Sequence, residues 1–176
     1  MRVTVKIGDI LDEPVDVLIC SANVHLNLSG GVGGAILARG GQSVQDALHA
    51  HLRQAGVPWV APGTVVQTDS GPLVVGHLLH AVAIDGFYGS SVPLVRETII
   101  RALNLAAGLG ARSVAIPALA TGYGPLSIAE FAEALLGSLG RAYDPVADLR
   151  VVLHDQTALD DWPETELDQD VKRSLL

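Results

Sequence analysis

Residues 20–36 read Cys-Ser-Ala-Asn-Val-His-Leu-Asn-Leu-Ser-Gly-Gly-Val-Gly-Gly-Ala-Ile. They follow the apolar run 17–19, which predicts a strand that is buried on both faces. The glycines allow the backbone to approach a ligand closely and to adopt positive φ. The apolar residues from Ala35 onward predict a helix, and the free N–H groups at a helix start favour an anion. The stretch therefore predicts a phosphate site between a strand and a helix.

A second segment has the same construction. Residues 113–117 read Ser-Val-Ala-Ile-Pro and predict a short buried strand, and residues 121–124 read Thr-Gly-Tyr-Gly. A helix follows this glycine loop, with the capping-box pattern Ser127 to Glu130 at its start. Loops at the carboxyl ends of parallel strands lie at one edge of a sheet, so we expect the two loops to form one crevice.

The rest of the chain alternates between strand and helix patterns. Residues 2–7 alternate between apolar and polar side chains, which predicts a half-exposed strand. Further strands are predicted over 64–68, 77–84 and 149–153, and helices from about Val32, Ser43 and Ser91. This order predicts an α/β fold with three layers, α/β/α. We expect a mostly parallel mixed sheet of about six strands with helices on both faces.

Composition narrows the class of protein. The chain has 176 residues and a formal net charge of −8, and seven of its 19 acidic residues lie between 155 and 170. We therefore expect one domain over residues 1–155 and an acidic C-terminal tail over 156–176, with a short helix packed on the domain. Without a basic patch, binding to nucleic acid is not expected.

Other features of the sequence point to a location inside the cell. Apolar runs stay shorter than the roughly 18 residues of a membrane helix, so no membrane partner is predicted. The single cysteine, Cys20, excludes an internal disulfide and is typical of a reducing compartment, and we expect it to pack in the core of a cytoplasmic protein.

Several common sites are excluded. The chain lacks the P-loop pattern, the G-x-G-x-x-G fingerprint of a dinucleotide site and the G-x-S-x-G pattern of a nucleophilic serine. His49 and His51 are two residues apart on a predicted helix, and His77 and His80 are three apart on a predicted strand, so neither pair shares a face. We predict no metal and no cofactor.

Four motifs in order resemble those of macrodomains, the ADP-ribose-binding modules, and in particular the compact bacterial stand-alone type. They are Gly8-Asp9-Ile10, Ser21-Ala22-Asn23, Gly30-Gly31-Val32-Gly33-Gly34-Ala35-Ile36 and Pro117-Ala-Leu-Ala-Thr121-Gly122-Tyr123-Gly124. Their order and spacing match across residues 1–154. The resemblance implies a macrodomain fold and, as partner, ADP-ribose or an ADP-ribosylated protein.

The resemblance also implies roles for single residues. Asp9 would accept the adenine amino group, and Asn23 would bind the distal ribose and act as the catalytic residue. The two glycine loops would wrap the diphosphate, Tyr123 would lie against the distal ribose, and His154 would lie near adenine. The implied ligand-binding set is Asp9, Ile10, Ala22, Asn23, Gly30, Gly31, Val32, Gly33, Ala120, Thr121, Gly122, Tyr123, Gly124 and His154.

Some of these residues have simpler explanations. Asp9 and Asn23 are also typical turn residues, a core aromatic is the alternative for Tyr123, and His154 is equally well explained as a surface histidine. His25, two residues after Asn23, is an alternative general acid or base, or a solvent-facing loop residue.

One departure from the family pattern bears on activity. Many hydrolases of the family carry an aspartate that helps to activate water where this chain has Gly33. Hydrolysis would then depend on a water held by the substrate's phosphate beside Asn23. We expect hydrolysis of ADP-ribose from acidic residues of proteins, or of O-acetyl-ADP-ribose. The alternatives are a non-catalytic ADP-ribose reader and a different nucleotide-phosphate binder.

Overall fold

The computed structural model describes residues 1–163, and the predicted tail residues 164–176 lie outside the described part. The elements are β1 (Arg2–Ile7), η1 (Ile10–Asp12), β2 (Val17–Ala22), α1 (Gly31–Gly40), α2 (Gln42–Ala55), β3 (Val65–Asp69), β4 (His77–Val82), α3 (Val92–Gly108), β5 (Ser113–Ile116), α4 (Ile128–Ser138), β6 (Asp148–Leu153) and α5 (Gln156–Asp160).

Within residues 1–163, six strands form a single sheet in the order β1-β6-β5-β2-β4-β3. The neighbouring strands pair in parallel, except that β3 runs antiparallel to β4. The central strand β2 pairs with β4 from Val17↔His77 to Ala22↔Val82. Its residues Val17, Leu18 and Ile19 are fully buried, as the unbroken apolar run predicts.

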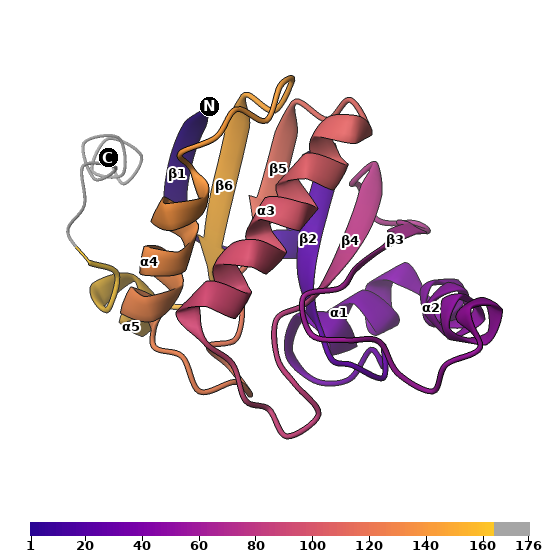
Figure 1. The fold of residues 1–176 in the computed structure, drawn as a ribbon. Coiled ribbons are helices and arrows are strands. Elements are labelled where there is room, and N and C mark those ends of the chain that lie inside the picture. The colour runs from indigo at the N-terminus through magenta and orange to yellow at the C-terminus, as the bar shows by residue number, and fades with distance from the viewer. Residues whose placement is uncertain (164–176) are drawn as a thin grey trace.

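Helices cover both faces of the sheet, which confirms the predicted α/β fold class. Helices α3 and α4 pack on the face that is nearer the viewer in Figure 1, and α1 and α2 pack on the far face. The apolar side chains form two cores, one on each face. Phe131, Ile99 and Leu103 belong to the α3–α4 core, and Ile36 and Leu48 belong to the α1–α2 core.

The helices begin and end at residues that satisfy their free backbone groups. The Ser91 side chain caps α3 by accepting the N–H of Leu94, and Ser127 and Glu130 cap α4 reciprocally. Helix α2 ends at Gly56 with φ +67°, a left-handed conformation that glycine adopts without strain. The resulting strand-loop-helix units bring the loops after β1, β2, β4 and β5 to the lower edge in Figure 1.

The structure differs from the sequence-based expectations in a few places. The short helix η1 was not predicted; the Asp9 side chain starts it by accepting the N–H of Leu11. The expected strand 77–84 ends at Val82 as β4. Helix α5, by contrast, lies where a short helix was expected at the start of the tail, and the ring of Trp162 just after it packs edge-on against Phe131 with centroids 6.2 Å apart. The division into domain and tail remains a prediction.

Candidate functional site

A cavity of about 800 Å³ opens at the carboxyl edge of the sheet. The fourteen residues that the resemblance implies as ligand contacts all line it: Asp9, Ile10, Ala22, Asn23, Gly30, Gly31, Val32, Gly33, Ala120, Thr121, Gly122, Tyr123, Gly124 and His154. The fold thus brings together four motifs that are far apart in the chain. Their roles as ligand contacts remain predictions.

The first glycine loop supplies backbone N–H groups at the start of α1. Gly30 caps this helix with φ +61°, and the N–H of Gly34 bonds to the carbonyl oxygen of Gly30 at 2.8 Å. Among the hydrogen bonds of the described residues, the N–H groups of Gly31, Val32 and Gly33 have no acceptor. All three residues line the cavity, so this wall is suited to bind an anion.

The second glycine loop faces the first across the cavity. Ala120 has φ +62°, and the loop is closed by a bond from the Leu126 N–H to the Ala120 carbonyl oxygen (3.1 Å) and one from the Thr121 hydroxyl to the Ala118 carbonyl oxygen (2.9 Å). A Cβ on Gly124 would lie 2.5 Å from the Ala120 oxygen, so this position requires glycine. The loop is therefore shaped by contacts within itself.

Tyr123 joins the two loops. Its side chain is 71% exposed, which excludes a role as a core aromatic. The hydroxyl lies so close to Gly30 that a side chain at Gly30 would collide with the ring. On its other side the Tyr123 ring lies 6.2 Å from the ring of Tyr88, a residue of the cavity wall that the sequence did not single out. Tyr123 thus spans the gap between the two glycine loops.

The opposite end of the cavity is formed by Asp9 and η1. Oδ1 of Asp9 accepts the N–H of Leu11 at 2.9 Å, and Oδ2 accepts Nη1 of Arg39 at 2.8 Å. The same guanidinium also pairs with Asp12. Asp9 is therefore both a turn residue and an oriented carboxylate at the cavity wall, and Arg39 links it to α1.

Glu13 fixes the segment that follows η1. Its carboxylate is 7% exposed and lies 2.7 Å from Nζ of Lys6 and 3.1 Å from Nη1 of Arg150. Burial alone would raise the pKa of Glu13, but the hydrogen bonds and charges of Lys6 and Arg150 lower it below its ordinary value. The η1 segment is thus attached to β1 and β6 by a half-buried ionic contact.

The amide of Asn23 organises its own loop. Oδ1 accepts the N–H groups of His25 (3.0 Å) and Asn27 (3.3 Å), and Nδ2 donates to the Asn27 carbonyl oxygen (2.8 Å). Asn23 therefore acts as a turn residue here while it lines the cavity. Asn27 also lines the cavity, and it was not predicted from the sequence.

Side chains of helix α2 hold the Asn23 loop through hydrogen bonds. Gln45, which is buried, accepts the Leu28 N–H at 2.7 Å and donates to the Leu26 carbonyl oxygen at 2.9 Å. His49 Nε2 donates to Oδ1 of Asn27 at 2.9 Å. Leu26 has φ +54°, which is unusual for a residue with a side chain, so these bonds hold a strained backbone in place.

A buried polar chain lies where β2 meets β4, below this loop. Nδ1 of His80 is 3.2 Å from the Cys20 sulfur, and its Nε2 is 2.9 Å from the Thr68 hydroxyl. Burial lowers the pKa of His80 to about 4 and raises that of the Cys20 thiol. Cys20 is therefore a packed, unreactive thiol, in agreement with the sequence prediction.

The remaining predicted histidines lie at the margin of the site. His154 lines the cavity, but its side chain is 87% exposed and pairs with Asp155 at 3.0 Å. The His25 ring lies edge-on to Trp59 with centroids 6.4 Å apart, and His25 does not belong to the cavity wall. This position does not favour His25 as a general acid or base.

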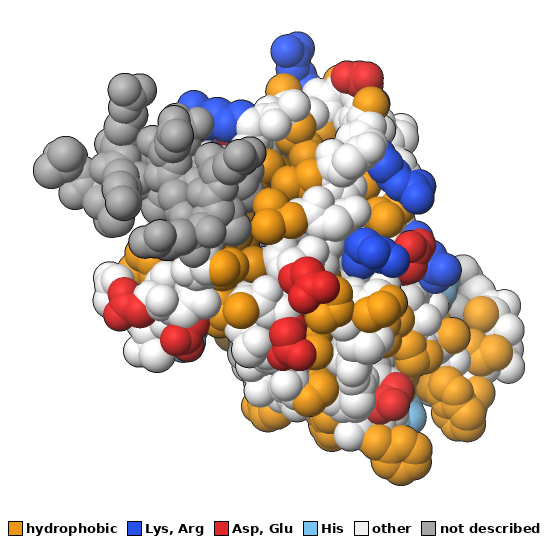
Figure 2. Space-filling model, turned by 60° about the vertical axis from the view of Figure 1, so that its left-hand side comes forward, with side chains coloured by type: hydrophobic (Ala, Val, Ile, Leu, Met, Phe, Trp, Pro, Cys, Tyr) orange, Lys and Arg blue, Asp and Glu red, His pale blue; other side chains and the backbone are white. Residues whose placement is uncertain are grey.

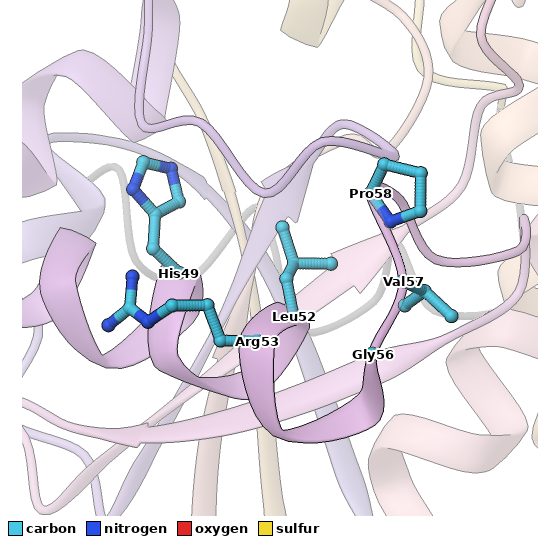
Figure 3. A pocket seen from close by; sticks show the side chains of 6 residues that line it. All are labelled: His49, Leu52, Arg53, Gly56, Val57 and Pro58. Carbon is cyan, nitrogen blue, oxygen red and sulfur yellow. The ribbon is translucent and has the colours of Figure 1, made fainter.

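A smaller hollow of about 350 Å³ lies at the end of α2 (Figure 3). His49 and Arg53 lie on one side, Val57 and Pro58 on the other, and Leu52 lies between them. Because His49 bonds to Asn27, the hollow lies behind the loop that carries Asn23.

Two kinds of feature are absent from residues 1–163. Within this range no three His, Cys, Asp or Glu side chains are grouped so that they could hold a metal ion. None of the helices in the same range combines the length and the apolar character that crossing a membrane requires.

Comparisons with known proteins agree with this geometry. The profile of the family described as Macro domain matches residues 19–135. A macro domain-containing protein from Streptomyces griseus is 36% identical over 163 residues, which are 89% of this chain and 90% of that protein. A protein from Enterobacter sp. called O-acetyl-ADP-ribose deacetylase is 33% identical over 123 residues, 69% of this chain and 67% of that protein.

Solved structures share the fold. A mutant macrodomain from Oceanobacillus iheyensis with ADPR has a TM-score of 0.81 at 23% identity, covering 98% of this chain and 91% of that one. The Trypanosoma brucei macrodomain in complex with ADP-ribose has a TM-score of 0.77 at 21% identity, covering 92% of this chain and 67% of that one. At these identities the likeness concerns the fold alone.

Proposed function

This chain belongs to the Macro domain family, and from that premise we propose that it binds ADP-ribose in the cavity at the carboxyl edge of the sheet. One observation carries the proposal: two glycine loops present backbone N–H groups to a single cavity whose wall contains neither Lys nor Arg. Such a wall suits a diphosphate that is held by backbone donors and by the dipole of α1.

The two ends of the cavity differ in their side chains, and this difference sets the orientation of the bound ligand. Adenine lies at the Asp9 end, where the oriented carboxylate accepts the exocyclic amino group. The distal ribose lies at the other end, between Asn23 and Tyr123. When the ribose binds, its hydroxyls replace some of the bonds that Asn23 makes with its own loop. A volume of about 800 Å³ is of the size that a nucleotide-like ligand fills.

The same pocket supports hydrolysis of an ester at the distal ribose. A water molecule held by the substrate's phosphate attacks the anomeric carbon, and the bond from that carbon to the acceptor's oxygen breaks, so that the acceptor leaves as a carboxylate. One proton of the water stays on the new anomeric hydroxyl, and the other passes to solvent. Gly33 supplies no carboxylate for this step, so orientation by the loops must provide most of the rate. Relatives called O-acetyl-ADP-ribose deacetylase favour this reaction class.

Because glycine at position 33 provides no general base, a non-catalytic ADP-ribose reader is the second candidate function. Gly33 lies in the first turn of α1, and a Cβ there would lie 3.5 Å or more from its neighbours. Gly33→Asp should therefore fold. If the protein is a reader or a slow hydrolase, this variant should raise turnover of an ADP-ribosylated glutamate peptide by roughly one to two orders of magnitude.

Calorimetric titration with ADP-ribose, and with ADP for comparison, tests the binding proposal. We expect affinity for ADP-ribose near 1 μM, in the range of about −8 kcal/mol, and weaker binding of ADP. Asn23→Ala should reduce the affinity for ADP-ribose more than the affinity for ADP. Equal affinity for the two ligands in the unmodified protein would contradict the distal-ribose assignment and would favour a general nucleotide-phosphate binder.

A further inference from the structure

The aromatic side chains of this protein are unevenly distributed. The chain has two Trp, three Tyr and two Phe residues, and four of these seven are exposed. These four form what we call the aromatic rim: Trp59 (57% exposed), Phe87 (94%), Tyr88 (54%) and Tyr123 (71%). Aromatic side chains usually contribute buried area to a core or an interface, so their concentration on exposed loops indicates a contact surface.

The four residues of the rim lie on loops that belong to the cavity wall or are bonded to it. Tyr88 and Tyr123 line the cavity and contact each other. The loop that bears Trp59 is joined to the Asn23 loop through a bond from the Val60 N–H to the Val24 carbonyl oxygen at 2.8 Å. Figure 2 shows hydrophobic side chains projecting at the lower edge, where these loops lie.

The loop that presents Phe87 is held by hydrogen bonds within itself. Oδ1 of Asp85 accepts the N–H of Phe87 at 2.8 Å and the N–H of Gly89 at 2.7 Å. Tyr88 has φ +65°, a strained conformation that this loop maintains. A loop held by such bonds loses less entropy when a partner covers the ring than an unrestrained loop would.

The charge of the loops around the cavity opening favours some classes of binding partner over others. The loops 22–30, 56–64, 83–91 and 117–126 contain no Lys or Arg, and Asp85 is their one acidic residue. In Figure 2 the Lys and Arg side chains lie away from the lower edge. Nucleic acid would need cations for its phosphates, so this surface suits a neutral or basic polypeptide.

We propose that the aromatic rim is a docking surface for the polypeptide that carries the ADP-ribose, so that the protein prefers modified proteins over small esters. This inference depends on the proposed binding of ADP-ribose. Phe87 lies outside the cavity wall, so an acetyl group on a ribose bound inside has no reason to contact it. A polypeptide chain attached to the same ribose leaves the cavity past the rim.

The test uses a short peptide with ADP-ribose attached through a non-hydrolysable linkage, and free ADP-ribose. Calorimetry measures both affinities for the unmodified protein, Phe87→Ala and Val74→Ala. Val74 is a matched control because it is 69% exposed and lies on the β3–β4 turn, at the opposite edge of the sheet. We expect the unmodified protein to bind the peptide conjugate more tightly than free ADP-ribose. Phe87→Ala should lower the affinity for the conjugate roughly tenfold and leave the affinity for free ADP-ribose unchanged.

The outcomes separate the two proposals. If the unmodified protein does not bind free ADP-ribose, the proposed function fails. If it binds ADP-ribose and the conjugate equally well, or if Phe87→Ala and Val74→Ala behave alike, the rim proposal is wrong while the proposed function stands. An ADP-ribosylated single-stranded oligonucleotide serves as the third ligand, and tighter binding of this ligand than of the peptide would overturn the assignment to a polypeptide.

Discussion

The two glycine loops reach the same cavity by different constructions. Residues 26–28, which lead into the first glycine loop, are held from outside by the buried amide of Gln45 and by His49 on α2. The second loop is held by bonds within itself, from Thr121 to Ala118 and from Leu126 to Ala120. One loop therefore depends on tertiary structure and the other on its local sequence.

The cores behind the loops show the same contrast. The α1–α2 face contains Gln45 and His80, buried polar groups that bond to distant segments. On the α3–α4 face, the buried hydroxyls of Thr98 and Ser138 bond to carbonyl oxygens of their own helices. Changes on the first face should therefore affect both stability and the loop, whereas changes at the second loop should affect ligand binding alone.

The largest effect is expected for Gln45→Leu. It leaves the Leu28 N–H and the Leu26 carbonyl group buried without partners, at a cost of about 4 kcal/mol of unfolding free energy. Urea denaturation measures this cost, and calorimetry should show a loss of ADP-ribose affinity. Gln42→Leu is the control, because Gln42 is exposed on the same helix and bonds only to Asp46 among the described residues. Equal effects of the two changes would contradict the role of Gln45.

The second-largest effect is expected at low pH, which should lower the unfolding free energy through a group on the α1–α2 face. The folded pKa of His80, about 4, lies below its ordinary value of 6.5 because of burial. The unfolded chain therefore binds the proton first, so this stabilisation is complete above pH 6.5 and is lost as pH falls toward 4. The expected loss is about 3 kcal/mol. Unfolding free energies at pH 7, 6, 5 and 4 measure it, and a His80→Leu variant with the same pH dependence would contradict the assignment.

A change in the second glycine loop should lower ligand affinity and leave the stability of the protein nearly unchanged. Tyr123→Ala removes an exposed ring, so stability should change by less than about 0.5 kcal/mol. The affinity for ADP-ribose should fall roughly tenfold, because the variant loses the contact between the loops and the packing against the ribose. Tyr123→Phe keeps the ring and should retain most of the affinity. A large loss of stability in Tyr123→Ala would show that this loop also supports the fold.

The smallest effect is expected at the adenine end. Arg39→Ala releases Asp9 from one of its partners, but both side chains are exposed and solvent screens the pair. We expect a loss of roughly threefold in ADP-ribose affinity, with no loss of affinity for ribose 5-phosphate, which has no adenine. Arg39→Lys should restore part of the affinity. Equal losses for both ligands would mean that Arg39 acts on the whole site.

Local patterns predicted the fold and the two glycine loops. The other predicted residues of the site came from the resemblance to macrodomains, and their roles as ligand contacts remain predictions. The apolar run 17–19, the glycine loops and the Ser127 capping box each specify their structure within a few residues. The bonds that Gln45 and His49 make to the Asn23 loop were not predicted, because they depend on which loop α2 packs against. The one local signal was a glutamine in the apolar row of Val44 and Leu48, both buried. No local signal in the sequence indicated Tyr88, since a strained aromatic residue on a loop follows no periodic pattern.

The placement of the two tryptophans gives the protein two independent optical reporters. Trp59 is 57% exposed on the loop that is bonded to the Asn23 loop, whereas Trp162 is 7% exposed and packs on Phe131. Their emission should differ in wavelength and in access to a soluble quencher, because one indole is hydrated and the other is not. Fluorescence from Trp59 would follow the arrival of a partner, and fluorescence from Trp162 would follow unfolding, in the same sample and without an added label.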